Sequence, residues 1–158
     1  MKNRFSDIYS LLQELSWHFG NHGVNGECCG DLSLAEFMAL KKVFENENCS
    51  VQEIGNGLNF TKSGATKIVN RLEGKGYVAR QNSPADGRVC CVSMNPKGRD
   101  AVSDIYNNYT AYLQDLLKDF EPQEVEQIQS ALEMLVSAIQ KNKSSDTFAA
   151  YCDGGKCS

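Results

Sequence analysis

Basic side chains are concentrated in one segment of the chain, residues 61–99. This segment carries eight Lys and Arg against two acidic residues, a net charge of +6, whereas the rest carries eight basic and eighteen acidic residues, a net charge of −10. Cations gathered on an otherwise acidic protein favour contact with a polyanion through that segment alone. The alternative is that these residues only form a solvated surface, as exposed charges commonly do.

A second group of chemically active side chains could bind a metal. His18, His22, Cys28 and Cys29 fall within twelve residues, and imidazole together with thiolate suits zinc or another thiophilic divalent ion. Their spacing matches no standard zinc motif, so a packed or exposed set without metal is the alternative. No cofactor is required by the rest of the sequence.

Other cysteines offer redox chemistry. Cys152 and Cys157 are separated by a glycine-containing segment, so the two thiols could form a reversible disulfide, or the tail that carries them could remain without fixed structure. Cys49 precedes a predicted helix, where the pKa of a thiol can be lowered and the thiol made reactive. Cys28 and Cys29 are further candidates for an effector or redox site. Cys90 and Cys91 lie on a predicted strand, so one should face the core and the other the surface.

The location of the protein is predicted from what the sequence lacks. Its polar start, Met1 to Arg4, has no apolar signal-peptide core, and no run approaches the ~20 apolar residues that span a bilayer. Seven cysteines are an odd number without a Cys-x-x-Cys motif, which favours reduced thiols over structural disulfides. We therefore expect a cytoplasmic protein that does not contact a membrane.

Helices must position most of these side chains. Apolar residues recur at spacings of three and four over residues 5–19, 34–44, 51–58, 68–72, 102–117 and 125–139. Capping boxes open two of these helices, one from Ser33 to Glu36 and one from Ser50 to Glu53, and Thr61 caps the next. Residues 21–30 are predicted to form a connection. Two short helices joined by a tight turn are typical of a helix-turn-helix.

Two predicted strands follow these helices. They run from Tyr77 to Ser83 and from Arg88 to Met94, and the turn between them has Pro84 and Gly87 in positions that suit a type I turn. Asn95 and Pro96 then begin a long helix that should end near residue 120. The sequence therefore predicts a mainly α protein with a small β-hairpin, called the wing.

Three sequence segments resemble the MarR family of winged helix-turn-helix transcription regulators. They are Thr61 to Val78, the wing from Ser83 to Arg88, and Met94 to Gly98, and the resemblance extends over residues 4–142. It implies a homodimer that binds a pseudo-palindromic operator in double-stranded DNA, usually as a repressor that a small ligand, a metal or an oxidant releases. Gly64 departs from the hydroxyl-bearing residue more usual in the family, which leaves the base preference open.

The resemblance also implies a division of the chain. Residues 31–95 should form the winged helix-turn-helix, and residues 1–30 and 96–142 a helical dimerisation region. The narrow apolar stripes of the first and last helices support pairing between two chains. Residues 143–158 are predicted to form a flexible tail that contains cysteines.

A recognition helix presents its first turns to base edges in the major groove. The residues placed to read or approach bases, with the Thr61 cap beside them, are Lys62, Ser63, Ala65, Thr66 and Lys67. Asn70 and Arg71, further along the same face, are expected to hold phosphates.

The wing supplies the last predicted DNA contact. Arg88 is placed to enter the adjacent minor groove, where narrow A·T stretches attract a guanidinium group. Asp86 could steady the Arg88 side chain, serve only as a turn residue, or do both.

The leading hypothesis is a dimeric DNA-binding regulator, not an enzyme, whose affinity responds to a ligand, a metal or thiol oxidation. The competing hypothesis is a redox or metal-sequestering protein that uses its cysteines directly. It is weakened because no nucleophile, base and orienting group recur at recognisable positions.

Overall fold

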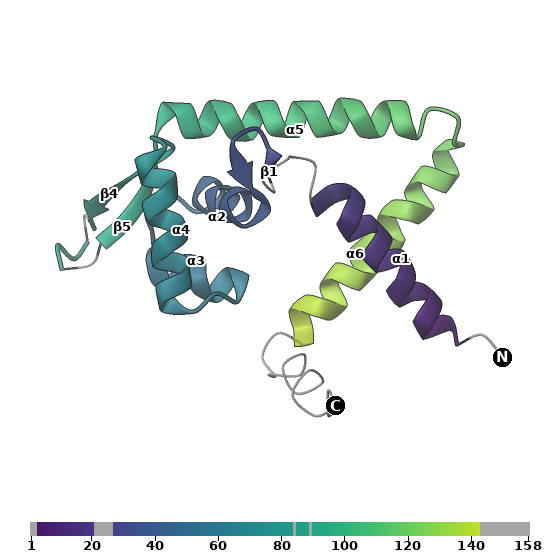
Figure 1. The fold of residues 1–158 in the computed structure, drawn as a ribbon, viewed down its shortest axis with the longest axis horizontal. Coiled ribbons are helices and arrows are strands. Elements are labelled where there is room, and N and C mark those ends of the chain that lie inside the picture. Colours follow the sequence, from purple (N-terminus) through teal and green to yellow (C-terminus); the bar gives the residue numbers. More distant parts are fainter. Residues whose placement is uncertain (1–2, 21–26, 84, 89, 143–158) are drawn as a thin grey trace. The chain divides into compact units, whose positions relative to one another are not determined.

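The computed structural model describes residues 3–20, 27–83, 85–88 and 90–142 (Figure 1). It divides into two compact units, residues 1–110 and 111–158. His22, Pro84, Cys152, Cys157, the side chain of Cys28 and the predicted tail lie outside the described residues. The described elements are mostly helices with a small antiparallel sheet, so the predicted fold class is confirmed.

The described residues of the first unit form five helices, if the long helix that continues beyond it is included. In chain order its elements are α1 (Arg4–Gly20), β1 (Glu27–Cys29), β2 (Leu32–Ser33), α2 (Leu34–Glu45), β3 (Cys49–Ser50), α3 (Val51–Leu58), α4 (Lys62–Gly74), β4 (Val78–Asn82), β5 (Cys90–Met94) and α5 (Pro96–Leu116). The second unit contains the end of α5 and α6 (Pro122–Asn142).

The predicted helix caps are present. The Ser33 side chain accepts a hydrogen bond from the Glu36 amide, and the Glu36 carboxylate accepts one from the Ser33 amide. Ser50 and Glu53 form the same reciprocal box at the start of α3. Thr61 Oγ1 accepts from the Gly64 amide at 3.1 Å and begins α4. These bonds satisfy amides that have no partner within the helix.

The sheet contains a strand that the sequence did not reveal. The order is β3-β5-β4, so the predicted hairpin β4–β5 is joined by the two-residue strand β3, in which Ser50 pairs with Cys91. The interpretation of residues 21–30 as a plain connection was wrong at its end, because β1 pairs with β2 in a second small sheet. Both β2 and β3 have only two residues, too few to show an alternating pattern.

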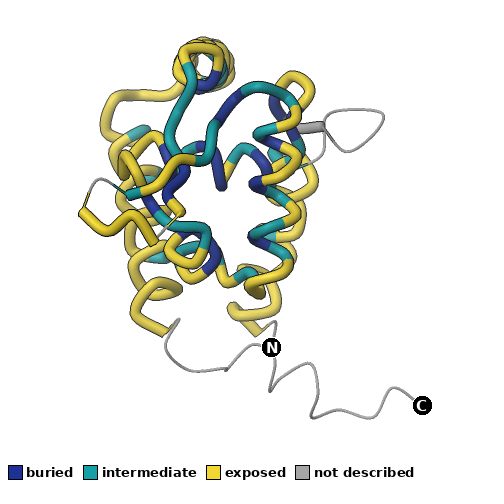
Figure 2. Tube along the Cα trace, turned by 90° about the vertical axis from the view of Figure 1, so that its left-hand side faces the viewer, coloured by how far each residue is buried: buried dark blue, intermediate teal, exposed yellow. Residues whose placement is uncertain are grey.

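One core holds α2, α3, α4, the three-stranded sheet and the start of α5 together. Leu40, Ile54, Leu72, Val92 and Val102 come from these different elements and are each 0% exposed. Buried residues, dark blue in Figure 2, alternate with exposed ones along these helices. Burial of each such side chain contributes about 1.5–3 kcal/mol, which makes this core the rigid support of α4 and the wing.

The start of α5 is fixed against the base of the wing. Asn95 donates from its backbone amide to Tyr77 O at 3.0 Å and from its side chain to Gly76 O at 3.1 Å. A Cβ on Gly98 would overlap the Tyr77 carbonyl oxygen, so only glycine permits this close approach. The helix begins at Pro96 as predicted but ends at Leu116, a few residues earlier than predicted.

The second unit has an open architecture. A turn over residues 117–120 separates α5 from α6, and Pro122 takes the first position of α6. None of the residues of α6 is buried. Within the described part of the chain, the helices are too short or too polar to cross a membrane.

Candidate nucleic-acid interface

The outer face of α4 is polar and basic. Lys62, Ser63, Lys67, Asn70 and Arg71 are all exposed, as predicted for a helix that meets DNA. Thr66 is half-buried, and its hydroxyl donates to the Lys62 carbonyl oxygen at 2.8 Å. The helix therefore presents long cationic and short polar side chains on one side, while Val69 and Leu72 pack into the core on the other.

Ala65 does not belong to this face. It is 0% exposed, and its Cβ lies 3.2 Å from the position that a Cβ on Gly55 would occupy. The prediction that Ala65 approaches bases was therefore wrong. Ala65 and Gly55 instead allow α3 and α4 to pack closely.

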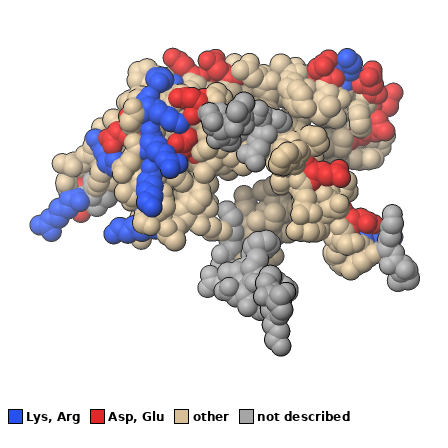
Figure 3. Space-filling model, in the orientation of Figure 1, with Lys and Arg blue, Asp and Glu red and all other residues tan. Residues whose placement is uncertain are grey.

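The basic residues of segment 61–99 fall into two sets. Four of them are engaged within the protein: Lys75 with Glu36, Arg80 with Glu73, Arg99 with Glu47, and Lys97 with the Lys75 carbonyl oxygen. The other four, Lys62, Lys67, Arg71 and Arg88, have side chains that make neither an ion pair nor a hydrogen bond with the described residues. We call these four the unpaired cations. Figure 3 shows Lys and Arg gathered over the part of the molecule that contains α4 and the wing.

Arg80 connects α4 to the wing, and the sequence analysis did not single it out. The Arg80 guanidinium donates to the Glu73 carboxylate and, at 2.6 Å, to Asn70 Oδ1, while its backbone amide donates to Glu73 at 3.1 Å. Asn70 thus has its oxygen turned toward Arg80, which leaves its amide group as the donor for a phosphate. The seven-residue separation of Glu73 and Arg80 crosses a helix end and a strand start, so no helix periodicity reveals it.

Short polar contacts shape the wing. Asp86 Oδ1 accepts from the Arg88 backbone amide at 3.0 Å, and Ser83 Oγ accepts from the Ala85 and Asp86 amides. Asp86 therefore acts as a turn residue, the simpler of the two roles predicted for it. Closer to the turn, the Gln81 side chain of β4 donates to Asn48 Oδ1 at 2.6 Å. The Arg88 side chain projects from a shaped turn and is exposed.

The predicted redox role of Cys49 is not supported by its environment. Cys49 is 7% exposed, and burial raises the pKa of its thiol, whereas the sequence predicted a lowered value at a helix N-terminus. That prediction was wrong because β3 buries the thiol before α3 begins. Cys29 and Cys91 are also buried, and Cys90 is exposed, so the expected inward and outward alternation of Cys90 and Cys91 is confirmed.

The predicted metal site stays a prediction. His18 is exposed on α1 and Cys29 is buried, while His22 and the Cys28 side chain lie outside the described residues. Among the residues that the structure describes, no three His, Cys, Asp or Glu side chains come together as metal ligands do. Cys152 and Cys157 also lie outside the described residues, so the roles predicted for them stay predictions.

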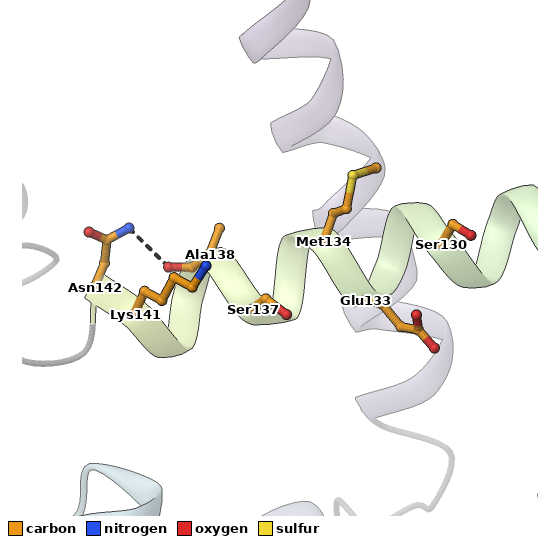
Figure 4. A pocket seen from close by; sticks show the side chains of 7 residues that line it. All are labelled: Ser130, Glu133, Met134, Ser137, Ala138, Lys141 and Asn142. Carbon is orange, nitrogen blue, oxygen red and sulfur yellow. Dashed lines mark hydrogen bonds between the residues drawn. The ribbon is translucent and has the colours of Figure 1, made fainter.

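Two shallow hollows can be described among residues 111–142. One follows a single face of α6 from Ser130 to Asn142, where the Asn142 side chain donates to the Ala138 carbonyl oxygen (Figure 4). A single helix cannot enclose a ligand, so this is an open surface. The other is an apolar groove between the end of α5 and α6, lined by Leu113, Leu117, Val125, Ile128, Leu132 and Val136 among others.

The fold and the polar face together define a class of protein. The helices α2, α3 and α4, a short turn between the last two, and a hairpin that follows them form a winged helix-turn-helix. The model of the MarR family matches residues 32–90, which are the same elements. Over these residues the chain is similar to the MarR family, whose members are DNA-binding transcription regulators and not enzymes.

Individual regulators and solved structures show the same similarity. The chain is 26% identical over 117 residues to the HTH-type transcriptional regulator MhqR of Bacillus subtilis, an alignment that covers 74% of this chain and 75% of MhqR. It resembles the structure of a MarR family protein from Bacillus stearothermophilus with a TM-score of 0.74 and 20% identity, over 89% of this chain and 99% of that one. The structure of Streptococcus pneumoniae FabT in complex with DNA gives a TM-score of 0.69 and 20% identity, over 87% and 96% of the two chains. The hypothesis of a redox or metal-sequestering protein is therefore not favoured.

Proposed function

We propose that the chain acts in the cytoplasm as a homodimeric transcription regulator that binds a pseudo-palindromic operator and represses transcription from it. The observation that carries this proposal is the set of four unpaired cations on α4 and the wing. These long cationic side chains have no partner among the residues that the structure describes, so they are available to phosphates and base edges, and a bound dimer would block access to a promoter.

The proposed contacts follow from the position of each side chain. Lys62, Ser63 and Lys67 lie on the first turns of α4, where a recognition helix meets the major groove. Thr61 and Thr66 have hydroxyl oxygens already bonded to the helix backbone, so they are proposed to shape this surface more than to read bases. Asn70 and Arg71 would hold phosphates, and Arg88 would enter the minor groove.

Unburied apolar side chains support dimerisation. No residue of α1 or α6 is buried, although α1 carries Phe5 at 79% and Trp17 at 70% exposure and α6 carries Met134 at 70%. A monomer would leave these faces and the apolar groove of the second unit in water. A second copy of the chain would cover them, and it would also place two recognition helices for the two halves of an operator.

The proposal includes an input signal that controls binding to the operator. A small ligand, a metal or thiol oxidation would change the spacing of the two recognition helices and so release the operator. Cys28 and Cys29 with His18 and His22 remain the proposed metal or redox input. Operator binding measured with and without zinc, and before and after peroxide, in the wild type and in a C28S/C29S variant tests this part.

The experiment that tests the function is selection of bound sequences from a pool of random duplexes, with the full chain as bait. We expect recovery of a pseudo-palindrome with half-sites about one helical turn apart, because two recognition helices related by symmetry read both halves. Recovery of an asymmetric site would contradict the dimer. Failure to enrich any sequence would contradict sequence-specific regulation.

A further inference from the structure

One acidic side chain is buried at the back of the proposed DNA-binding surface. Glu36, in the first turn of α2, is 4% exposed, and it is the only buried charged residue in the described part of the chain. Burial raises the pKa of its carboxyl, but hydrogen bonds from Ser33 and Lys75 outweigh that effect and hold the pKa below its ordinary value. Glu36 is therefore a carboxylate, and a buried carboxylate needs partners.

The partners of Glu36 come from two different helices. Its Oε2 atom accepts from the Ser33 amide at 2.8 Å, which caps α2, and from Lys75 Nζ at 3.0 Å. Lys75 is the C-terminal cap residue of α4. One oxygen atom thus joins the beginning of α2 to the end of the proposed recognition helix.

Further contacts extend from Lys75 to the wing and α5. Lys75 Nζ also donates to the Asp31 carbonyl oxygen at 2.5 Å, and Tyr77 donates its hydroxyl to Asp31 Oδ1 at 2.5 Å. Lys97 donates to the Lys75 carbonyl oxygen at 2.7 Å, with its Nζ 4.4 Å from the centre of the Tyr77 ring. Burial and the bond to Asp31 raise the pKa of Tyr77 to about 12, so Tyr77 stays a donor at neutral pH.

The chain contains a natural comparison for Glu36. Glu53 occupies the same position in the capping box of α3 and makes the same bonds with Ser50, but it is exposed and has no Lys or Arg partner among the described residues. Capping α2 therefore does not require a buried ion pair. Replacing a buried pair with apolar residues is often neutral or stabilising, so stability alone does not account for it either.

We propose that Glu36 and Lys75 are positioning residues that fix the orientation of α4 and the base of the wing against α2, and that this orientation gives the protein its selectivity for one DNA sequence. The proposal rests on the DNA binding proposed above. Hydrogen bonds to base edges require a correctly oriented helix, whereas contacts with phosphates tolerate small rotations. Loss of the pair should therefore reduce selectivity more than general affinity for DNA.

The test uses conservative variants of the full chain. Glu36→Gln keeps the size of the side chain and an oxygen to cap α2, Lys75→Met keeps the aliphatic stem, and Glu53→Gln is the matched control. Affinity is measured at fixed salt for the duplex that the wild type selects and for a scrambled duplex of the same length. Circular dichroism and thermal melting confirm that each variant is folded at the assay temperature.

We expect Glu36→Gln and Lys75→Met each to lower affinity for the selected duplex about five- to tenfold. Affinity for the scrambled duplex should change less than twofold. The double variant should lose no more than either single variant, because both changes remove the same contact. Lys75→Arg, which retains the charge, should recover part of the loss, and Glu53→Gln should bind as the wild type does.

Other results would overturn the proposal. Equal losses in Glu36→Gln and Glu53→Gln would assign the effect to helix capping. If only Lys75→Met loses affinity, and loses it equally for both duplexes, Lys75 is a simple phosphate contact. If all variants bind with wild-type affinity, the pair does not have the proposed role. Failure of the wild type to bind any duplex would instead contradict the proposed function, so the two failures are distinguishable. If Glu36→Gln does not fold, Lys75→Met and Lys75→Arg carry the test.

Discussion

At the scale of single residues, the role of a basic side chain depends on whether it has a partner within the protein, and not on its charge alone. Segment 61–99 contains eight basic residues, but four of them hold the wing, α5 and the end of α4 in place. The unpaired cations Lys62, Lys67, Arg71 and Arg88 are the ones that remain for DNA. The high density of basic residues in this segment therefore has two sources, internal contacts and the proposed DNA contacts.

Arg88 gives a direct test of the wing. Arg88→Ala should weaken binding to the selected duplex by about 1–3 kcal/mol if its guanidinium reads the minor groove. The loss should be concentrated at A·T positions flanking the half-sites, since narrow minor grooves attract the side chain. Asp86→Ala, which removes the turn bond to the Arg88 amide, should cost less. Equal affinity of the wild type and Arg88→Ala at one salt concentration would remove the wing from the interface.

The thiols differ in burial and should differ in reactivity. Among Cys29, Cys49, Cys90 and Cys91, we expect an alkylating reagent to modify Cys90 first in the native protein, since only Cys90 is exposed. Cys49 should react slowly because it is buried and its pKa is raised. Peptide mass mapping after brief labelling measures the order, with urea-unfolded protein as the control. Faster labelling of Cys49 than of Cys90 would contradict this description of β3.

At the scale of elements, the helix starts were predictable because caps are local. A capping box spans four residues, so Ser33 with Glu36 and Ser50 with Glu53 identify their helices without any tertiary contact. The strand β3 could not be predicted, because two residues are too few to show alternating polarity. Its pairing with β5 depends on residues that are distant in the sequence. The burial of Ala65 also escaped prediction, since one alanine fits either face of a helix.

The same two boxes predict an acid dependence of stability. The pKa values of Glu36 and Glu53 are below the ordinary value of 4.5, Glu53 because of its bonds with Ser50. A carboxyl whose pKa is lower in the folded state stabilises the fold above pH 4.5, and this contribution is lost as the pH falls through the folded-state pKa. Urea midpoints should therefore fall below pH 4.5, and less steeply in a Glu36→Gln/Glu53→Gln variant. Parallel curves for the two proteins would contradict these lowered values.

At the scale of the whole molecule, the charge and the apolar surface are segregated along the chain. The unpaired cations lie on α4 and the wing, whereas exposed apolar side chains are concentrated on α1, the end of α5 and α6. The proposed regulator would use both surfaces, one for the operator and one for its second copy. The apolar spacing of the terminal helices predicted the second surface, but whether a stripe packs within the chain or against a partner depends on tertiary structure.

The hydrogen bonds among Glu36, Lys75, Asp31 and Tyr77 could not be predicted from the sequence. Asp31 and Tyr77 are 46 residues apart in the sequence, and three contacts within this group join residues at least 39 apart. The periodicity of residues within one helix or strand does not indicate such distant pairs. From the sequence alone, Lys75 cannot be distinguished from the other basic residues of segment 61–99. Only the fold shows that it lies beside a buried carboxylate.

The central claim is that the unpaired cations, and not the paired ones, neutralise DNA phosphates. The most direct test is the salt dependence of duplex affinity, measured for the wild type and for two variants, Arg71→Ala and Arg99→Ala. Each variant loses one positive charge. Arg71 is unpaired on α4, and Arg99 is paired with Glu47. We predict that Arg71→Ala lowers the slope of log affinity against log salt by about 2 for a dimer, since each phosphate contact contributes about 0.9, while Arg99→Ala leaves it unchanged. Equal slopes for the two variants, or a wild-type affinity that does not depend on salt, would contradict the account.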